Sequence, residues 1–170
     1  MAQYRKKQTT DISVNYAKDD EYMTPASAWE NIKHLIPKDK IIWECFYGDG
    51  TSGRNLEALG FEVIHKPIDF FEENEGEILV SNPPFSIKRK VFTRLKELNK
   101  PFIMICPCAM LTTQYMRGLF ADDNDFQIVV PRKRIQFMKH DGASSGAGCS
   151  FDCFYYCWKI GLENQITWLE

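Results

Sequence analysis

The sequence predicts an α/β fold, a doubly wound and mostly parallel sheet with helices on both faces. Short apolar runs at 41–46, 78–80 and 101–107 alternate with stretches of helical periodicity, the pattern of strands joined by crossover helices. Two of these runs end in turn sequences, Gly48-Asp49-Gly50 and Asn82-Pro83-Pro84. Both turns are therefore expected at the carboxyl ends of strands, where open α/β sheets bind their ligands.

Length and composition indicate one domain. The chain has 170 residues, 44% of them hydrophobic, enough for a single core. Residues 1–20 are polar without periodicity and are expected to form a flexible arm, with the domain at 21–170. We expect no membrane span and no secretory signal. The six cysteines lie mostly in apolar runs without zinc spacing, so we expect no metal and a reducing compartment, cytoplasmic or nuclear.

The first predicted helix runs from about residue 25 to 35. Thr24 suits the N-cap and Pro25 the first helical position, and the apolar residues Ala28, Trp29, Ile32, Leu35 and Ile36 form one face. The strand at 41–46 then leads into a glycine-rich turn and a helix at 55–59. Such glycines let the backbone approach a ligand, and the helix start supplies free N–H groups.

The turn Gly48-Asp49-Gly50-Thr51-Ser52-Gly53 also has the G-x-G-x-x-G spacing of dinucleotide sites, with Asp69 about 20 residues further on. A dinucleotide site is therefore a rival hypothesis. After a strand at 60–65, too few residues precede Glu77 for another strand and its helix, so a third strand is expected to be missing.

The remaining elements follow from apolar spacing. Ser86 is expected to cap a helix whose face carries Ile87, Val91, Leu95 and Leu98. A helix is predicted at 111–120, β-structure at 126–130, 134–138 and 151–158, and an edge strand at 165–169. The glycine- and serine-rich loop at 141–148 is expected to connect 134–138 and 151–158 as an antiparallel hairpin.

Asn82-Pro83-Pro84-Phe85 combines groups that hold a planar amino group. The amide oxygen of Asn82 and the carbonyl of Pro83 can each accept one of its two hydrogens, and Phe85 can stack on its face.

This tetrapeptide after a strand is similar to the catalytic motif of S-adenosylmethionine-dependent N6-adenine methyltransferases. Glu44-Cys45-Phe46-Tyr47-Gly48-Asp49-Gly50 resembles the family's D-P-F-x-G-x-G, with Glu for Asp and Cys for Pro. Asp69-Phe70-Phe71 resembles its D-F-[FL] element. The resemblance is to a small form without a target-recognition domain. It implies the Rossmann-like class I methyltransferase fold with strand order 2-1-4-5-7-6.

The resemblance also implies the site residues. Asn82, Pro83, Pro84 and Phe85 would be catalytic. S-adenosylmethionine would be bound by Tyr22, Thr24, Pro25, Glu44, Phe46, Gly48, Gly50, Asp69, Phe70 and Asn82. A flipped adenine of DNA, or of RNA, would lie between Phe85 and Phe151, and its phosphates would meet Lys88, Arg89 and Arg134. Residues 139–150, a homodimer or a specificity subunit would contribute any sequence recognition.

Three alternatives remain open at this point. A protein glutamine methyltransferase would offer the same NH₂ group to such a turn, usually with Tyr where this chain has Phe85. A dinucleotide-binding protein would use the glycine-rich turn instead. A non-catalytic subunit could keep the methyltransferase fold and present a basic surface.

Overall fold

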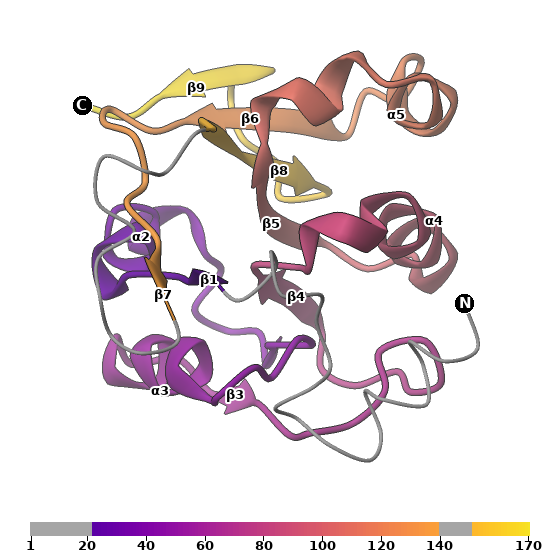
Figure 1. Cartoon of the computed structure of the whole chain (residues 1–170). Coiled ribbons are helices and arrows are strands. Elements are labelled where there is room, and N and C mark those ends of the chain that lie inside the picture. Colours follow the sequence, from indigo (N-terminus) through magenta and orange to yellow (C-terminus); the bar gives the residue numbers. More distant parts are fainter. Residues whose placement is uncertain (1–21, 140–150) are drawn as a thin grey trace.

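The structure, a computed structural model, describes residues 22–139 and 151–170 (Figure 1). Its main sheet has seven strands in the order β3-β2-β4-β5-β8-β6-β9. Every neighbouring pair is parallel except those made by β8, which runs against both β5 and β6. The strands are β2 (Ile42–Trp43), β3 (Val63–Ile64), β4 (Ile78–Ser81), β5 (Phe102–Pro107), β6 (Phe126–Val130), β8 (Cys153–Trp158) and β9 (Ile166–Trp168).

This order confirms the predicted doubly wound α/β fold. If the strands are numbered along the chain and the number 3 is left for the missing strand, the order reads 2-1-4-5-7-6, and the expected edge strand β9 follows. Residues 65–77 form neither helix nor strand, so the third strand is missing, as expected. The chain passes directly from β3 at one side to β4 on the far side of β2.

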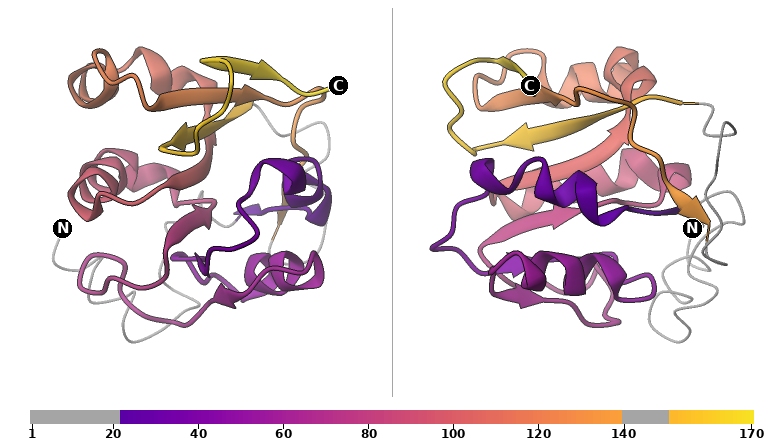
Figure 2. Two further views of the ribbon diagram at one scale, coloured as in Figure 1. Left: turned by 180° about the vertical axis from the view of Figure 1, so that it is seen from behind. Right: turned by 90° about the vertical axis from the view of Figure 1, so that its left-hand side faces the viewer.

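The helices cover both faces of the sheet (Figures 1 and 2). Along β5, Ile103 and Ile105 pack in one cluster with Trp29 of α2 (Ala26–Glu30) and Leu56 of α3 (Thr51–Ala58). The alternate residues, including Met104, pack in a second cluster with α4 (Lys88–Leu98) and α5 (Gln114–Phe120). Short 3₁₀ turns η3 (Lys33–Leu35), η4 (Phe85–Ile87) and η5 (Cys108–Thr112) complete these segments. Over the described part of the chain, no helix has the length and apolarity to cross a membrane.

One predicted strand was wrong. Residues 134–138 do not pair in the main sheet; the antiparallel partner of β8 is β6. Ile135 and Phe137 are buried in a core cluster that holds residues of α2 and of the main sheet, so the alternating pattern is satisfied by burial of these side chains rather than by strand pairing. Only β7 (Met138–Lys139) pairs, with β1 (Tyr22–Met23), in a separate two-stranded ribbon. The predicted arm at 1–20 and the loop at 141–148 lie outside the described residues.

Two predicted helix caps were also wrong. The N-cap of α2 is Pro25, without a side-chain hydrogen bond, and that of α4 is Ile87, which follows η4. Neither Thr24 nor Ser86 is a helix N-cap, since both caps lie one residue later than predicted. By contrast, α3 begins at Thr51, earlier than predicted, so its first turn directly adjoins the glycine-rich turn.

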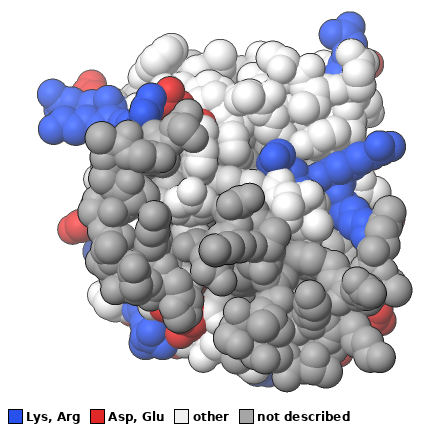
Figure 3. Space-filling model, in the orientation of Figure 1, with Lys and Arg blue, Asp and Glu red and all other residues white. Residues whose placement is uncertain are grey.

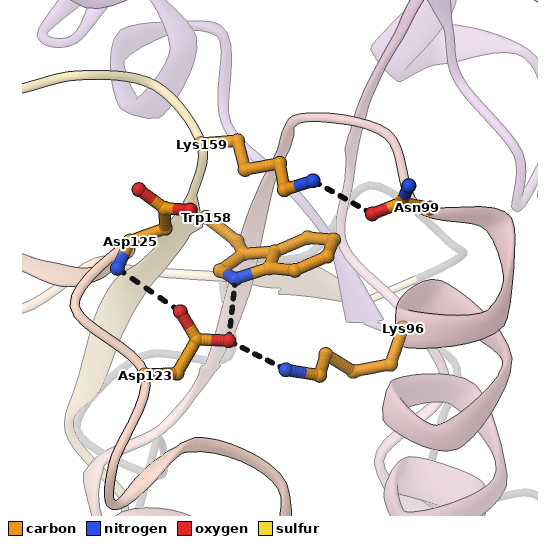
Figure 4. A network of polar contacts seen from close by, with 6 residues as sticks. All are labelled: Lys96, Asn99, Asp123, Asp125, Trp158 and Lys159. Atoms are coloured by element: carbon orange, nitrogen blue, oxygen red, sulfur yellow. Dashed lines mark hydrogen bonds and ion pairs between the residues drawn. The ribbon is translucent and has the colours of Figure 1, made fainter.

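The amino ends of the parallel strands are joined by a polar network (Figure 4). Trp158 donates its indole N–H to Asp123 at 3.0 Å, and Lys96 donates to the same carboxylate oxygen at 2.5 Å. Lys159 lies 4.5 Å from the Trp158 ring and donates to Asn99 at 2.6 Å. Burial raises the pKa of Asp123, but its hydrogen bonds outweigh this effect and the pKa is lowered. The network therefore favours the ionised carboxylate.

Candidate active site

A hollow of about 500 Å³, partly open to solvent, lies at the carboxyl ends of β2 and β4. These neighbouring strands lead the chain in opposite directions along the sheet, β2 to β3 and β4 to β5, which is the switch point where such sheets bind ligands. Its lining comprises Tyr22, Met23, Thr24, Glu44, Phe46, Tyr47, Gly48, Asp49, Ser52, Asn82, Pro83, Pro84 and Phe85. The two motifs singled out in the sequence thus meet in one place.

Asn82 is the most informative residue of the hollow. It follows Ser81, the last residue of β4, and the next residue, Pro83, has no N–H to continue the ladder. Its Oδ1 atom is buried and has no hydrogen-bond partner among residues 22–139 and 151–170. A buried acceptor without a donor is unfavourable, so this oxygen is suited to a donor supplied by a ligand.

Thr24 presents a second buried acceptor. Its Oγ1 atom also lacks a partner, and the residue lines the same hollow. The ribbon of β1 and β7 positions this segment, since Tyr22 pairs with Lys139 and Met23 with Met138. Two unpartnered oxygens from segments far apart in the sequence therefore border one space.

Glu44 is a buried carboxyl group at the end of β2. Only 1% of the residue is exposed. Its Oε1 atom accepts from the Phe46 N–H at 3.1 Å and from the Ser81 hydroxyl. Burial raises the pKa of Glu44 to about 8, although both hydrogen bonds oppose this shift. The group is therefore mainly protonated at neutral pH, and an entering cation would favour its ionised form.

The glycine-rich turn leaves space for a ligand at Gly48. Its φ of +58° lies in the left-handed region, and an added Cβ would meet only the Phe46 carbonyl oxygen, at 3.9 Å. Gly50 differs: a Cβ there would lie 2.8 Å from Arg54 Nη1 and 3.0 Å from Tyr47 Oη. Gly48 thus borders open space, whereas Gly50 is favoured by its left-handed φ of +83°, since the atoms near it are the ends of flexible side chains.

Four residues predicted to bind the cofactor do not line the hollow: Pro25, Gly50, Asp69 and Phe70. Asp69 is 3% exposed, and its Oδ1 atom accepts from the Phe71 N–H at 2.8 Å. Phe70 is fully buried against Phe46, with ring centroids 4.9 Å apart. In this structure Asp69 and Phe70 stabilise the 65–77 loop through these contacts. The dinucleotide hypothesis consequently lacks an accessible acidic residue at Asp69.

Sequence reasoning missed four lining residues: Met23, Tyr47, Asp49 and Ser52. These four residues occupy the unspecified positions within the motifs. Their position inside the motif segments is the feature that could have predicted them. Tyr47 stacks on His65 at a centroid distance of 6.1 Å and an angle of 15°, and His65 Nε2 lies 3.0 Å from Glu57 Oε1. This aromatic pair lies at the carboxyl end of β3.

Phe85 and Phe151 come together, as predicted, but not as two parallel plates. Their ring centroids are 5.2 Å apart at 83°, and Phe85 also meets Phe137 edge-on at 6.1 Å. Tyr22 joins this aromatic cluster through Phe151 at 5.8 Å. A base between two rings needs them nearly parallel and roughly 7 Å apart, two van der Waals contacts. The rings must therefore move apart before the predicted sandwich can form.

The basic residues around the site differ in availability. Lys88 is half-buried and Arg89 exposed at the start of α4, and neither belongs to an ion pair within residues 22–139 and 151–170. Arg134 instead pairs with Asp152 through two contacts of 2.7 and 3.2 Å. These bonds lower the pKa of Asp152. A phosphate would have to share Arg134 with this carboxylate.

Comparisons with known proteins give little further information. No protein-family model and no curated protein matches the chain. Among solved structures, it is similar to a Listeria monocytogenes protein provisionally described as a class I S-adenosylmethionine-dependent methyltransferase. The identity is 9%, the TM-score is 0.47, and the match covers 99% of this chain and 73% of that one. Such a similarity is too low to carry a functional argument.

Proposed function

We propose that this protein transfers a methyl group from S-adenosylmethionine to the N6 amine of adenine in nucleic acid, with DNA as the favoured substrate. The observation that carries the proposal is the unpartnered Oδ1 of Asn82 in a hollow at the sheet's switch point. It is joined there by Pro83 and Phe85, the combination that can accept two amine hydrogens and contact a planar ring.

The residues of the hollow fit the proposed cofactor. S-adenosylmethionine supplies an electrophilic methyl group on a sulfonium, so the reaction needs alignment more than a protein nucleophile. Glu44 would receive the cofactor's ammonium group. Gly48 would let its methionine portion lie on the backbone, because a Cβ added at Gly48 would meet only the Phe46 carbonyl oxygen among the described residues. The unpartnered hydroxyl of Thr24 would contribute a further polar contact.

Asn82 would act on the acceptor amine. The lone pair of an exocyclic amine is delocalised into the ring and is a poor nucleophile. Accepting its two hydrogens at Asn82 Oδ1 and the Pro83 carbonyl favours a pyramidal nitrogen whose lone pair points at the methyl group. Preorganised acceptors of this kind contribute roughly two to three orders of magnitude in rate. The proton can leave after transfer, so no separate base is required.

A methyl-transfer assay tests the proposal directly. Purified protein is incubated with tritiated S-adenosylmethionine and with single- and double-stranded DNA and RNA, and the products are digested to nucleosides. We expect label in N6-methyladenosine or its deoxy form. Label in cytosine, or none in any nucleic acid, would overturn the proposal.

Two further arms separate the alternatives. Glutamine-containing peptides are offered in place of nucleic acid, since a side-chain amide presents the same NH₂ group. Binding of NADH is compared with binding of S-adenosylmethionine by calorimetry. Labelled peptide would favour the glutamine methyltransferase, whereas NADH binding without S-adenosylmethionine binding would favour the dinucleotide hypothesis. Cofactor binding without any transfer would leave a non-catalytic subunit.

A further inference from the structure

Trp168 is unusual among the tryptophans of this protein. Trp29, Trp43 and Trp158 are buried, whereas Trp168 is 73% exposed. It ends β9, and its side chain makes no hydrogen bond or ring contact within the described residues. An indole left in water at the end of an edge strand contributes little to the core, so its exposure needs another explanation.

The surroundings of Trp168 are basic. The residue lines an open hollow of about 1260 Å³ with Arg132 and Lys133, which follow β6, and with His34. Glu170 is the one acidic lining residue; Asn31, Thr167 and Leu169 complete the wall. Neither Arg132 nor Lys133 has an ion-pair or hydrogen-bond partner in the part of the chain that the structure describes. A flat aromatic ring thus stands beside two cations whose charges are not paired.

Sheet topology brings this hollow toward the candidate active site. β9 is parallel to β6 and, through β8, β6 runs in the direction of β5 and β4. The end of β9 therefore lies at the same edge of the sheet as Asn82. Figure 3 shows Lys and Arg side chains in two separate groups on this face of the molecule, with acidic side chains beside one of the groups.

We propose that the hollow beside Trp168 is a second nucleic-acid contact, in which the indole stacks on an unpaired base and Arg132 and Lys133 bind the flanking phosphates. The choice of partner rests on the proposed function. Exposed aromatic rings next to cations are the usual means of holding single strands without sequence preference. An acidic peptide would satisfy the cations but would leave the indole without a planar partner.

The spacing of the two sites predicts a minimum strand length. Four strand spacings separate β4 from β9, which is roughly 19 Å at the usual interstrand distance. A stacked strand advances about 3.4 Å per nucleotide, so roughly six nucleotides span the two sites. Oligonucleotides shorter than this should reach only one of them.

Intrinsic fluorescence provides the test, because Trp168 is the exposed tryptophan. The full chain, without cofactor, is titrated with a twelve-nucleotide oligothymidine, which lacks adenine. We expect quenching of Trp168. Inorganic polyphosphate, which has phosphates but no bases, should compete for binding without quenching. Equal quenching by polyphosphate, or by polyglutamate, would overturn the proposal.

Variants assign the effect to residues. Trp168→Ala should weaken oligothymidine binding roughly 5- to 100-fold, and Trp168→Phe less, because it retains a stacking face. Arg132→Gln/Lys133→Gln should flatten the dependence of log affinity on log salt by about 1.4 units. The controls are Ile166→Ala, another exposed apolar residue of β9, and Lys38→Gln/Lys40→Gln, which precede β2. Unchanged affinity in Trp168→Ala would contradict the proposal.

The outcome is separable from that of the proposed function. Quenching by oligothymidine without methyl transfer to any adenine would keep the contact and reject the enzyme. Methyl transfer to adenine without quenching of Trp168 would keep the enzyme and reject the contact. If acrylamide loses access to Trp168 as protein concentration rises without nucleic acid, the surface joins copies of this chain and the inference is wrong.

Discussion

At the scale of residues, the polar atoms at the carboxyl edge of the sheet are not satisfied by the protein itself. Asn82 Oδ1 and Thr24 Oγ1 are buried without partners in the described part of the chain, and Glu44 holds a proton because it is buried. Each of these states is unfavourable for folding alone. Their coincidence in one hollow is what distinguishes a ligand site from ordinary packing, and it generates three predictions.

Replacing Asn82 should separate binding from catalysis. We expect Asn82→Ala to leave S-adenosylmethionine affinity nearly unchanged and to reduce single-turnover methyl transfer by at least about 10²-fold, because it removes an acceptor of the reacting amine. Asn74→Ala, at an exposed asparagine of the 65–77 loop, is the matched control. Near-normal turnover in Asn82→Ala would reduce the Asn-Pro-Pro-Phe segment to a structural turn.

Glu44 should make folding stability depend on pH. The unfolded carboxyl ionises near pH 4.5, whereas the folded group keeps its proton to about pH 8. Between these values the folded state binds the extra proton, so this contribution to the unfolding free energy is present at low pH and is lost as pH rises, with a limiting slope of about 1.4 kcal/mol per pH unit. The free energy of unfolding measured in urea should therefore fall more steeply from pH 5 to 8 for the wild type than for Glu44→Gln.

The control for this comparison is Glu62→Gln, at an exposed residue, which should track the wild type. A constant difference between wild type and Glu44→Gln across the range would show that Glu44 is ionised in the folded protein.

Cofactor binding should release a proton from Glu44. An ammonium group beside the buried carboxyl favours its ionised form, so binding at pH 7 should release up to about one proton. Calorimetry in buffers of different ionisation enthalpy measures this number. Adenosine, which lacks the amino-acid portion, should release none. Equal proton release by adenosine and S-adenosylmethionine would place the cation elsewhere.

At the scale of elements, α4 follows the candidate site directly and carries the basic residues proposed to contact nucleic acid. Lys88 and Arg89 occupy its first turn directly after η4, whereas Arg94 further along donates to the Glu73 carbonyl at 3.1 Å and holds the 65–77 loop. The basic residues in the first turn of α4 therefore remain available to a ligand, whereas Arg94 in its middle has a structural role. The sequence alone does not distinguish these two groups of basic residues.

Neutralising the start of α4 should weaken nucleic-acid binding irrespective of sequence. We expect Lys88→Gln/Arg89→Gln to reduce the slope of log affinity against log salt by about 1.4 units on single strands and about 1.8 units on duplex DNA, since two phosphate contacts are lost. Lys38→Gln/Lys40→Gln, before β2 at the opposite edge, is the charge-matched control. A variant whose affinity fell for one sequence alone would show that these residues read bases.

At the scale of the whole molecule, the two edges of the sheet have different roles. The carboxyl edge carries unpartnered oxygens, whereas the amino edge carries the paired network of Lys96, Asp123 and Trp158 (Figure 4). Polar groups at the amino edge satisfy one another and stabilise the packing of α4 against β8. Stability and ligand binding are thus assigned to opposite ends of the same strands.

A substitution at the amino edge should affect stability alone. Asp123→Ala leaves the Trp158 indole N–H without its acceptor, and we expect a loss of about 1 to 3 kcal/mol in the free energy of unfolding with unchanged cofactor binding. Chemical denaturation and calorimetry measure the two quantities. Asp122→Ala, at an exposed neighbour, is the control. Weaker cofactor binding in Asp123→Ala would mean that the two edges are coupled.

The sequence by itself determined where the two turns that border the hollow lie, whereas the strand order was implied by the family resemblance and is confirmed by the sheet. Apolar runs ending in Gly48-Asp49-Gly50 and Asn82-Pro83-Pro84 located both turns at strand ends, because glycine and proline act through local backbone geometry. The missing third strand followed from the shortness of 65–77. These features depend on a few neighbouring residues, so they can be read without the fold.

Tertiary structure alone decided which side chains remain available. Asp69 and Arg134 suited a ligand in the sequence, yet Asp69 accepts from Phe71 and Arg134 pairs with Asp152. Conversely, Trp168 carried no signal until β9 was seen at the sheet edge beside Arg132 and Lys133. The burial and pairing of a polar or aromatic group depend on residues far away in the chain, and only folding brings those residues together.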